Sequence, residues 1–236
     1  MTNLLEIKNV SKSFGEKQIL KDVSFSIKPN QIVGLIGQNG SGKTTIFKLI
    51  NDLLTPTSGE ILFNGKPIGV QSKKDISYLP ERTYFDKYTK IEDALTFFET
   101  FYDNFDRAKA ERLLVDLNLD KAQSFEKMSK GMKEKVQLVL VMSRRAKLYI
   151  LDEPLGGVDP ATRDYILDTI LNNFDENASL FISTHMIADI ERILDEVIML
   201  DNGKIVLSGN ADKLRQKENK SIDEIFRSKV YGKKSY

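Results

Sequence analysis

Short apolar runs alternate with helical patterns along this chain, which predicts an α/β fold. Residues 4–10 and 23–27 alternate apolar and polar side chains, as strands with one buried face do. Residues 31–36 form a nearly continuous apolar run, which is typical of a strand buried on both faces of a parallel sheet. Residues 46–50 continue as a helix, and residues 61–65 form a strand that ends in a hairpin turn at an Asn-Gly pair.

The pattern becomes mainly helical between about residues 81 and 145. One apolar stripe at helical spacing contains Ile91, Leu95, Phe98, Phe101, Tyr102 and Phe105. Strands return after this segment, and we expect them at 148–151, 180–183, 197–200 and 205–207. The whole pattern predicts one α/β core that is interrupted by a helical insertion.

Composition excludes several classes of site. The 236 residues contain no cysteine and one histidine, which excludes disulfides, thiolate metal sites and histidine clusters. The formal net charge is +1, whereas nucleic-acid binding normally requires a clear basic excess, so we expect no nucleic-acid partner. No apolar run approaches the ~20 residues that span a bilayer, and the start MTNLLEIKNV lacks a secretion-signal pattern. We therefore expect a cytoplasmic protein.

The segment from Lys213 to Tyr236 is basic, with eight Lys and Arg against three Asp and Glu. Such a charge run favours a solvated helix followed by a frayed end. The alternative is a face that lies near anionic lipid.

A glycine-rich loop provides the first chemical motif. GQNGSGKT at residues 37–44 matches G-x-x-x-x-G-K-[ST], and it lies between a predicted strand and a predicted helix, as this motif requires. Glycines let backbone N–H groups surround phosphates, and the helix N-terminus adds its dipole. Lys43 would neutralise the β- and γ-phosphates, and the Thr44 hydroxyl would bind Mg²⁺. This motif predicts a nucleoside triphosphate without separating a kinase, a GTPase or a motor.

A second motif is the apolar strand LYIL, which ends in Asp152 and Glu153. Ligands of parallel sheets bind at this carboxyl edge. Neighbours on a strand point to opposite faces, so we expect the two acids to differ in role. Asp152 suits the Mg²⁺ shell, and Glu153 suits a base that polarises an attacking water.

With these motifs in place, the chain resembles the nucleotide-binding subunits of ATP-binding cassette (ABC) transporters, from Leu4 to about Lys217. The resemblance implies a Walker A loop at 37–45, a signature at 128–132 and a D-loop at 156–159. It implies these ATP-binding residues: Phe14, Gly37, Asn39, Gly40, Ser41, Gly42, Lys43, Thr44 and Thr45. It also implies catalytic roles for Glu153, His185 and Lys43, partner-ATP contacts from Ser129, Lys130, Gly131 and Met132, a D-loop Asp159, and Mg²⁺ near Thr44, Asp152 and Glu81.

The chain departs from the family pattern at two motifs. The signature keeps Ser129 and Gly131 but has Lys130 and Met132 where Gly and Gln are usual, and the phosphate-gripping groups survive. Glu81 stands at the glutamine position of the Q-loop, where an acid can still reach Mg²⁺ or water as a charge. These features look most like cassettes of exporters for peptides, lipids or drugs, including the antibiotic-responsive YtrB type.

The resemblance implies a P-loop NTPase fold with a RecA-like core. The core and an N-terminal antiparallel β subdomain would occupy about 1–80 and 146–217, a helical subdomain about 81–145, and a short basic tail 218–236. Two cassettes, identical or different, would share two ATP molecules and drive integral membrane subunits. The protein would then lie on the inner face of the cell membrane. Tyr84, Phe85 and Tyr88 are candidates for the groove that receives a helix of the membrane subunit, and ordinary packing is the alternative.

Other classes remain open at this point. A soluble ABC ATPase could act on DNA or the ribosome, but this chain has one cassette and no long heptad run. A non-hydrolysing regulatory cassette is disfavoured because Lys43, Asp152, Glu153 and His185 are intact. A P-loop kinase or GTPase would not need the signature, the D-loop or the histidine.

Overall fold

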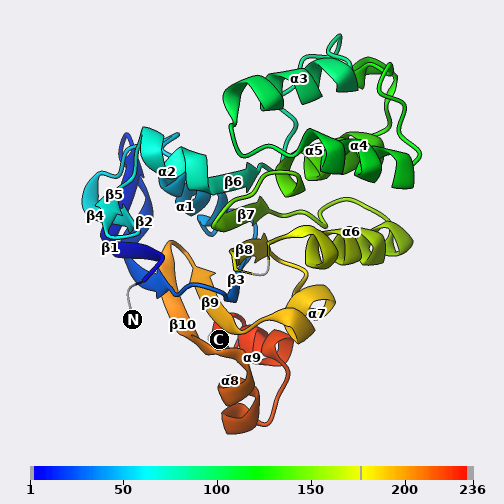
Figure 1. The fold of residues 1–236 in the computed structure, drawn as a ribbon. Helices are drawn as coiled ribbons and strands as arrows, with labels where there is room; N and C mark the ends of the chain where they lie inside the picture. Colours follow the sequence, from blue (N-terminus) through cyan, green and yellow to red (C-terminus); the bar gives the residue numbers. More distant parts are fainter. Residues whose placement is uncertain (1–2, 176, 233–236) are drawn as a thin grey trace. The chain divides into compact units, whose positions relative to one another are not determined.

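The computed structural model describes residues 3–175 and 177–232. The chain divides into two compact units, and we describe each by itself. The first combines the N-terminal part up to Lys73 with the C-terminal part from Ser179, and the second runs from Lys74 to Ala178. The expected α/β class is confirmed, because both units combine strands with helices (Figure 1).

An antiparallel sheet forms one part of the first unit. Its strands follow the order β2-β1-β4-β5. They are β1 (Leu5–Phe14), β2 (Lys17–Ile27), β4 (Ser58–Phe63) and β5 (Lys66–Pro67). Leu5 pairs with Ile27 and Phe14 with Lys17, so β1 and β2 form a long hairpin. The predicted alternation is visible at Leu5 and Ile7, and a register irregularity in the pairing then moves the next buried side chain to Val10.

A mainly parallel sheet forms the other part of the first unit. Four of its strands follow the order β10-β9-β3-β8. They are β3 (Ile32–Gly37), β8 (Ser179–Thr184), β9 (Glu196–Asp201) and β10 (Lys204–Asn210). β3 pairs in parallel with β8 and β9, and β10 returns antiparallel to β9. Helix α1 (Lys43–Ile50) packs on this sheet through Phe47, whose ring centroid lies 4.9 Å from that of Phe181.

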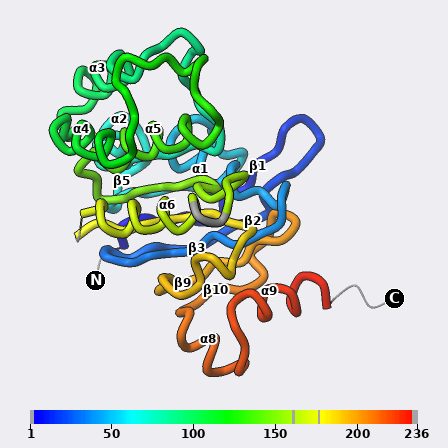
Figure 2. The backbone as a smooth tube through the Cα atoms, turned by 90° about the vertical axis from the view of Figure 1, so that its right-hand side faces the viewer, coloured from blue at the N-terminus to red at the C-terminus, as the bar shows by residue number. Residues whose placement is uncertain are grey.

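The C-terminal segment is folded, which corrects the expectation of a solvated helix. It contains α8 (Ala211–Glu218) and α9 (Ile222–Val230). Helix α9 begins with a capping box of Ser221 and Glu224. Four apolar side chains at helical spacing are buried: Ile222, Ile225, Phe226 and Val230. They hold α9 against α8 and against α7 (Ile187–Ile190), which precedes the 3-10 turn Glu191–Ile193. Figure 2 shows α8 and α9 beside the β9–β10 hairpin. Residues 233–236 lie outside the described residues.

The second unit contains two parallel strands and a group of helices. The strands are β6 (Ile76–Leu79) and β7 (Leu148–Asp152), with Tyr78 opposite Ile150. The helices are α3 (Ile91–Phe101), α4 (Arg107–Asp116), the 3-10 turn Phe125–Lys127, α5 (Lys130–Met142) and α6 (Pro160–Asn173). The short helix α2 (Val70–Asp75) spans the boundary between the units.

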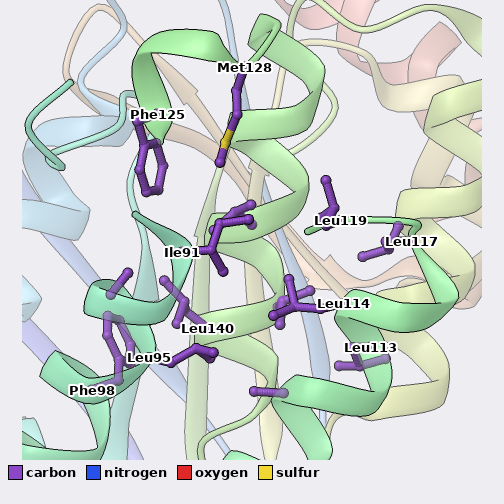
Figure 3. Packing of buried hydrophobic residues seen from close by; sticks show 14 residues of the cluster. Ile91, Leu95, Phe98, Leu113, Leu114, Leu117, Leu119, Phe125, Met128 and Leu140 are labelled. Carbon is purple, nitrogen blue, oxygen red and sulfur yellow. The ribbon is translucent and has the colours of Figure 1, made fainter. Parts of the chain in front are cut away.

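The helices of this unit share a hydrophobic core (Figure 3). Ile91, Leu95 and Phe98 contribute the buried face of α3, as predicted. The predicted stripe is wrong at Phe101, where α3 ends and the side chain is exposed. Tyr102 still packs against this core. Since Phe105 lies beyond the helix end, it packs against the core from the loop that leads to α4.

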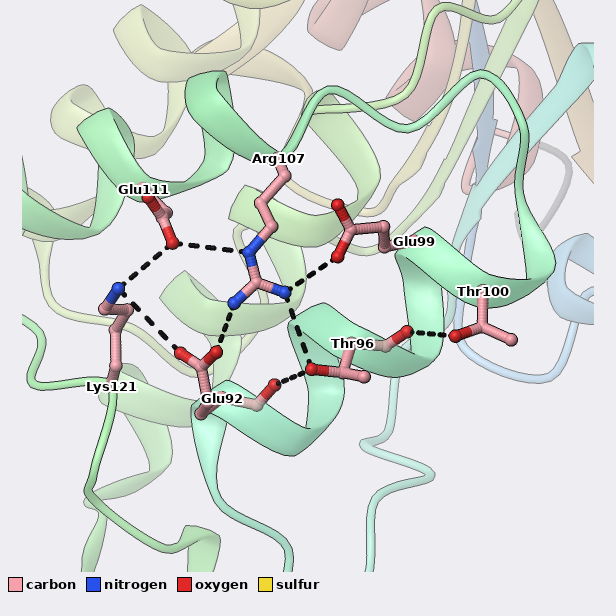
Figure 4. A network of polar contacts seen from close by, with 7 residues as sticks. All are labelled: Glu92, Thr96, Glu99, Thr100, Arg107, Glu111 and Lys121. Atoms are coloured by element: carbon pink, nitrogen blue, oxygen red, sulfur yellow. Dashed lines mark hydrogen bonds and ion pairs between the residues drawn. The ribbon is translucent and has the colours of Figure 1, made fainter.

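A polar network fastens α3 to α4 (Figure 4). The Arg107 guanidinium donates to Glu99 at 3.0 Å, to Glu111 at 3.3 Å and also to Glu92. Lys121 Nζ lies 3.0 Å from the same Glu111 oxygen. Several charges that share one arginine orient both helices more firmly than an isolated surface pair would.

A buried arginine connects the helices to the strands of the second unit. Arg144 donates to the Ile76 carbonyl at 2.7 Å, to the Lys74 carbonyl at 2.8 Å and to Asn104 Oδ1 at 3.1 Å. Its guanidinium carbon lies 3.8 Å from the ring centroid of Tyr102, within the range of a cation–π contact. This side chain therefore holds the end of α5 against the start of β6.

Within the described ranges, none of the helices combines the length and the hydropathy needed to cross a membrane.

Candidate nucleotide-binding and catalytic residues

The glycine-rich loop joins β3 to α1 in the first unit, and its glycines are required by geometry. Gly40 and Gly42 have φ angles of 80° and 114°, a region that L side chains rarely adopt. A Cβ on Gly37 would lie 2.6 Å from the Leu200 carbonyl oxygen, so this position also excludes larger residues. Gly42 is the N-cap of α1, and the first N–H groups of that helix have no partner within the helix. Such a loop is suited to an anion.

The loop holds the ammonium group of Lys43. Lys43 Nζ donates to the Gly37 carbonyl at 2.8 Å and to the Gln38 carbonyl at 3.2 Å, and the side chain is buried. Thr44 and Thr45 follow in the first turn of α1 and are half-buried, whereas Asn39 is exposed. Ser41 Oγ is a buried hydroxyl that makes no hydrogen bond to any described residue. The loop thus carries one positive charge and short hydroxyls at the helix start.

Strand register brings the single histidine to the edge of this sheet. Ile36 of β3 lies opposite Thr184 of β8 in a parallel pair, so the loop after Gly37 and the residue after Thr184 leave the sheet together. That residue is His185, and its side chain is exposed. Phe14 lies elsewhere in this unit, at the end of β1, with 49% of its surface exposed. Lys12 Nζ lies 5.0 Å from its ring centroid.

The carboxylate pair lies in the second unit. All residues of β7 are buried, and Asp152 is 1% exposed at its carboxyl end. Glu153 has a φ of 51°. Asn and Asp account for every other non-glycine residue with positive φ in the described chain, because their short side chains tolerate this region. Glu153 is therefore strained by about 1 kcal/mol or more, as is common at functional sites.

The left-handed turn at Glu153 changes the predicted geometry. We expected strand alternation to point Asp152 and Glu153 to opposite faces. That expectation is wrong, because the strand ends at Asp152 and both residues line one small pocket. Glu81 lines the same pocket, so three of the predicted acids come together. The pocket has a volume of about 20 Å³, enough for roughly one water molecule.

The electrostatics of this pocket affect a neighbouring phenol. Burial raises the pKa of Tyr78 above its ordinary value, and the charges of Asp152 and Glu81 raise it further. The phenol therefore stays protonated beside a concentration of negative charge.

Two further residues of the pocket, Glu134 and Gln137 of α5, were not predicted from the sequence. They are one helical turn apart and so share a face of the helix. Gln137 is 3% exposed. The available signal was a single polar residue inside the apolar run Val136–Met142, which a buried polar side chain with a function would produce.

Residues of the segments predicted as signature and D-loop line a second pocket of about 260 Å³ in this unit. Ser129 is the N-cap of α5 and accepts a hydrogen bond from Met132 N at 3.2 Å. Asp159 is the N-cap of α6 and accepts from Thr162 N at 3.1 Å. Gly131, Met132 and Lys135 complete one side. The pocket therefore lies at the starts of two helices, where partial positive charge accumulates.

The three aromatic residues after Glu81 separate into two kinds. Phe85 packs against the helical core, with its ring 4.9 Å from that of Phe125, so ordinary packing is correct for this residue. Tyr84 and Tyr88 are exposed.

Comparisons with known proteins give a consistent result. The family model described as "ABC transporter" matches residues 20–156. The chain is 33% identical over 217 residues to the ABC transporter ATP-binding protein YtrB of Bacillus subtilis (strain 168), which covers 90% of this chain and 74% of that protein. It is 28% identical over 234 residues to the lantibiotic transport ATP-binding protein SrtF of Streptococcus pyogenes, covering 96% and 97%. A solved structure of an ATP-binding subunit of an ABC transporter has a TM-score of 0.84 and 31% identity, covering 94% and 98%.

Proposed function

Because the chain belongs to the ABC transporter family of ATP-binding subunits, whose members hydrolyse ATP to power transport, we propose that it is the motor of a membrane exporter. The observation that carries this proposal is the geometry of the phosphate loop. Glycines with a left-handed backbone conformation lead into the N-terminus of α1, and the loop carbonyls hold the Lys43 ammonium there. This arrangement suits the triphosphate of ATP.

Mg²⁺ accompanies ATP in this proposal. Thr44 supplies a hydroxyl and Asp152 a buried carboxylate, and these hard oxygen donors fit Mg²⁺. Among the described residues, no cluster of His, Cys, Asp or Glu could hold a metal by itself. That fits an ion that is bound largely through substrate phosphates and water. When bound, Mg²⁺ neutralises charge on the phosphates, and Glu81 lies in the pocket of Asp152 as a further oxygen donor.

Hydrolysis transfers the γ-phosphoryl group of ATP to water. Glu153 accepts a hydrogen bond from the attacking water and takes its proton. The water oxygen forms a bond to the γ-phosphorus as the bond to the β-phosphate oxygen breaks, and ADP and phosphate leave. Lys43 and His185 stabilise charge on the γ-phosphate. The strained turn at Glu153 supports this role, because it fixes the carboxylate at the end of a fully buried strand.

A second copy of this chain, or a different cassette, completes each site. The pocket of Ser129 and Asp159 receives the ATP that is held by the phosphate loop of the partner. Ser129 and the N–H groups of α5 contact its γ-phosphate, and Gly131 and Met132 line the same pocket. Lys130, the first residue of α5, is proposed to contact the same ATP. A two-fold dimer makes this exchange reciprocal, so two ATP molecules close the dimer and hydrolysis releases it.

Replacing the base tests the proposed chemistry. Glu153→Gln keeps the shape of the side chain and removes the proton acceptor, so the rate of hydrolysis is expected to fall by about 10²- to 10⁴-fold. ATP then remains bound, and the variant is expected to elute as a dimer in gel filtration with ATP and as a monomer without it. A Glu153→Gln variant that hydrolyses ATP at the wild-type rate would contradict the role of Glu153.

The membrane partner is proposed to contact the helical subdomain, at about residues 81–145. The name of the relative SrtF includes lantibiotic transport, which supports export of a peptide, lipid or drug. Exposed Tyr84 and Tyr88 follow Glu81 directly and offer aromatic surface for a helix of the partner. The chain would thus be peripheral, on the cytoplasmic side of the membrane.

A matched pair of variants tests this contact. Tyr88→Glu is expected to lower ATP hydrolysis in the assembled complex and to leave the affinity for ATP unchanged, and exposed Val115→Glu on α4 serves as the control. Loss of ATP affinity in Tyr88→Glu would instead assign the residue to the nucleotide site.

A pull-down of the tagged chain from gently solubilised membranes tests the kind of partner. Recovery with a multi-span membrane protein supports transport, whereas recovery with ribosomes or DNA contradicts it.

A further inference from the structure

Glu134 of α5 has contacts in two directions. One of its oxygens, Oε1, is 3.6 Å from Lys130 Nζ, one turn earlier on α5. Its side chain also lines the pocket of Asp152 and Glu153. The side chain of Glu134 is 19% exposed, whereas that of Lys130 is 70% exposed. One residue thus connects the signature surface to the pocket of the catalytic base.

The side chain of Lys130 lies close to Gly157, in the segment predicted as the D-loop. Gly157 has a φ of 76°, and a Cβ added there would collide with Lys130 Nζ. The ammonium group therefore lies against the backbone of the turn that leads to Asp159. A lysine in this position adds a positive charge at the edge of the signature surface, and a phosphate bound there would compete with Glu134 for that charge.

The other oxygen of Glu134 has different surroundings. Oε2 is fully buried and has no hydrogen-bond partner among the described residues, and the same is true of Gln137 Oε1. Both side chains line the pocket that Glu153 lines. An unpaired buried acceptor is costly, so a rearrangement that brings a hydrogen-bond donor to either oxygen is favoured.

We propose that Glu134 is a positioning residue for ATP hydrolysis, which links phosphate at the signature, sensed by Lys130, to the arrangement of Glu153. With Lys130 paired to it, the Glu134 carboxylate is held toward the signature. When a γ-phosphate attracts Lys130, the Glu134 carboxylate loses its partner. It then forms hydrogen bonds inside the pocket and orders the polar groups around Glu153. This inference rests on the proposed function, because it assumes that the signature contacts phosphate.

A double-mutant cycle on the full-length chain tests the link. Lys130→Met and Glu134→Gln each remove one charge and keep the length of the side chain. Each is expected to lower kcat roughly tenfold, and the double variant is expected to be no slower than either single variant, because residues that act as one unit are not additive. The Kd for ATP at the phosphate loop should stay within twofold of the wild-type value. Lys130→Arg keeps the charge and should restore most of the rate.

Two controls separate this role from a merely structural one. Lys133→Met removes a positive charge from the same turn of α5 at a position without an assigned role, and its kcat should match the wild type. The melting temperatures of Lys130→Met and Glu134→Gln should also match that of the wild type. A salt bridge whose lysine is largely exposed adds little stability.

The possible failures are distinguishable. Effects that multiply to about a hundredfold in the double variant would overturn the link, as would a Glu134→Gln variant with wild-type kcat. Either result would leave the proposed function intact. A wild-type chain that does not hydrolyse ATP would overturn the proposed function and this inference together.

Discussion

At the scale of single residues, backbone conformation separates Glu153 from its surroundings. Left-handed positions in the described chain are otherwise filled by Gly, Asn or Asp, which adopt this region with little strain. A glutamate there has no local advantage, so its place is explained by what its carboxylate does. Lys43 is a similar case, because its buried ammonium is held by carbonyls of the loop itself.

The strain at Glu153 leads to a stability prediction. Glu153→Asn removes the charge and suits the left-handed backbone, whereas Glu153→Gln removes the charge and keeps the strain. We expect the free energy of unfolding of Glu153→Asn to exceed that of Glu153→Gln by about 0.5–1 kcal/mol, measured by urea denaturation. Both variants should be inactive. Equal stability of the two would show that the turn stores no strain.

Lys43 leads to a binding prediction. Lys43→Ala removes the charge that the loop presents to the phosphates, and charged hydrogen bonds of this kind contribute about 1.5–3 kcal/mol. The Kd for ATP is therefore expected to rise by roughly 10- to 150-fold in isothermal titration calorimetry. Lys48→Ala, at an exposed position of the same helix, should bind ATP like the wild type. Similar losses in both variants would contradict a specific role for Lys43.

At the scale of elements, several helices begin at a residue whose side chain caps the helix N-terminus. Ser129, Asp159 and Ser221 cap α5, α6 and α9, and Asp106 caps α4. The Asp106 carboxylate accepts a hydrogen bond from Lys109 N at 2.9 Å and one from Arg145 at 3.1 Å. The backbone hydrogen bond is the main cause that lowers the pKa of Asp106 below its ordinary value of 3.8, and Arg145 adds to it.

The Asp106 cap predicts a pH dependence. Because its pKa is lower in the folded state, the carboxylate stabilises the fold above pH 3.8, and this contribution is lost as the pH falls through the folded pKa. Asp106→Asn keeps a good N-cap without the charge. The wild type should therefore lose more stability than this variant between about pH 5 and pH 2, by less than about 1 kcal/mol. Asp116→Asn is the control, and a wild-type profile parallel to that of Asp106→Asn would refute the prediction.

Elements were predictable from sequence where the signal was local. Continuous apolar runs located β3, β7 and β8, and the motif located the loop between β3 and α1. The end of α3 was not predictable, since Phe101 and Phe105 continue the apolar spacing after the helix has ended. The sequence did not decide between packing and a partner surface for Phe85, and it did not reveal the buried face of α9. Burial of these apolar side chains depends on partners far away in the sequence. The acid pocket shows the same limit, since Glu134 and Gln137 reach it only through the packing of α5.

At the scale of the whole molecule, each nucleotide site of the proposed dimer takes half of its residues from one chain and half from the other. The phosphate loop belongs to the first unit, and the signature pocket belongs to the second. If two chains share each ATP, a defect in the loop of one chain and a defect in the signature of the other fall in the same site of a mixed dimer. The second site of that dimer is then intact.

The most direct test of the account is ATP hydrolysis by a mixture of two inactive variants. Lys43→Ala disables the phosphate loop, and Ser129→Asp keeps the cap of α5 but places a negative charge where phosphate should bind. An equimolar mixture is expected to recover activity, up to about a quarter of the wild-type rate, because half of the dimers are mixed and each holds one intact site. The link through Glu134 would lower this fraction, since the signature of the chain that supplies Glu153 to the intact site binds no phosphate. If the mixture stays as inactive as its components, although gel filtration with ATP shows mixed dimers, the two chains do not share their sites and the account is wrong.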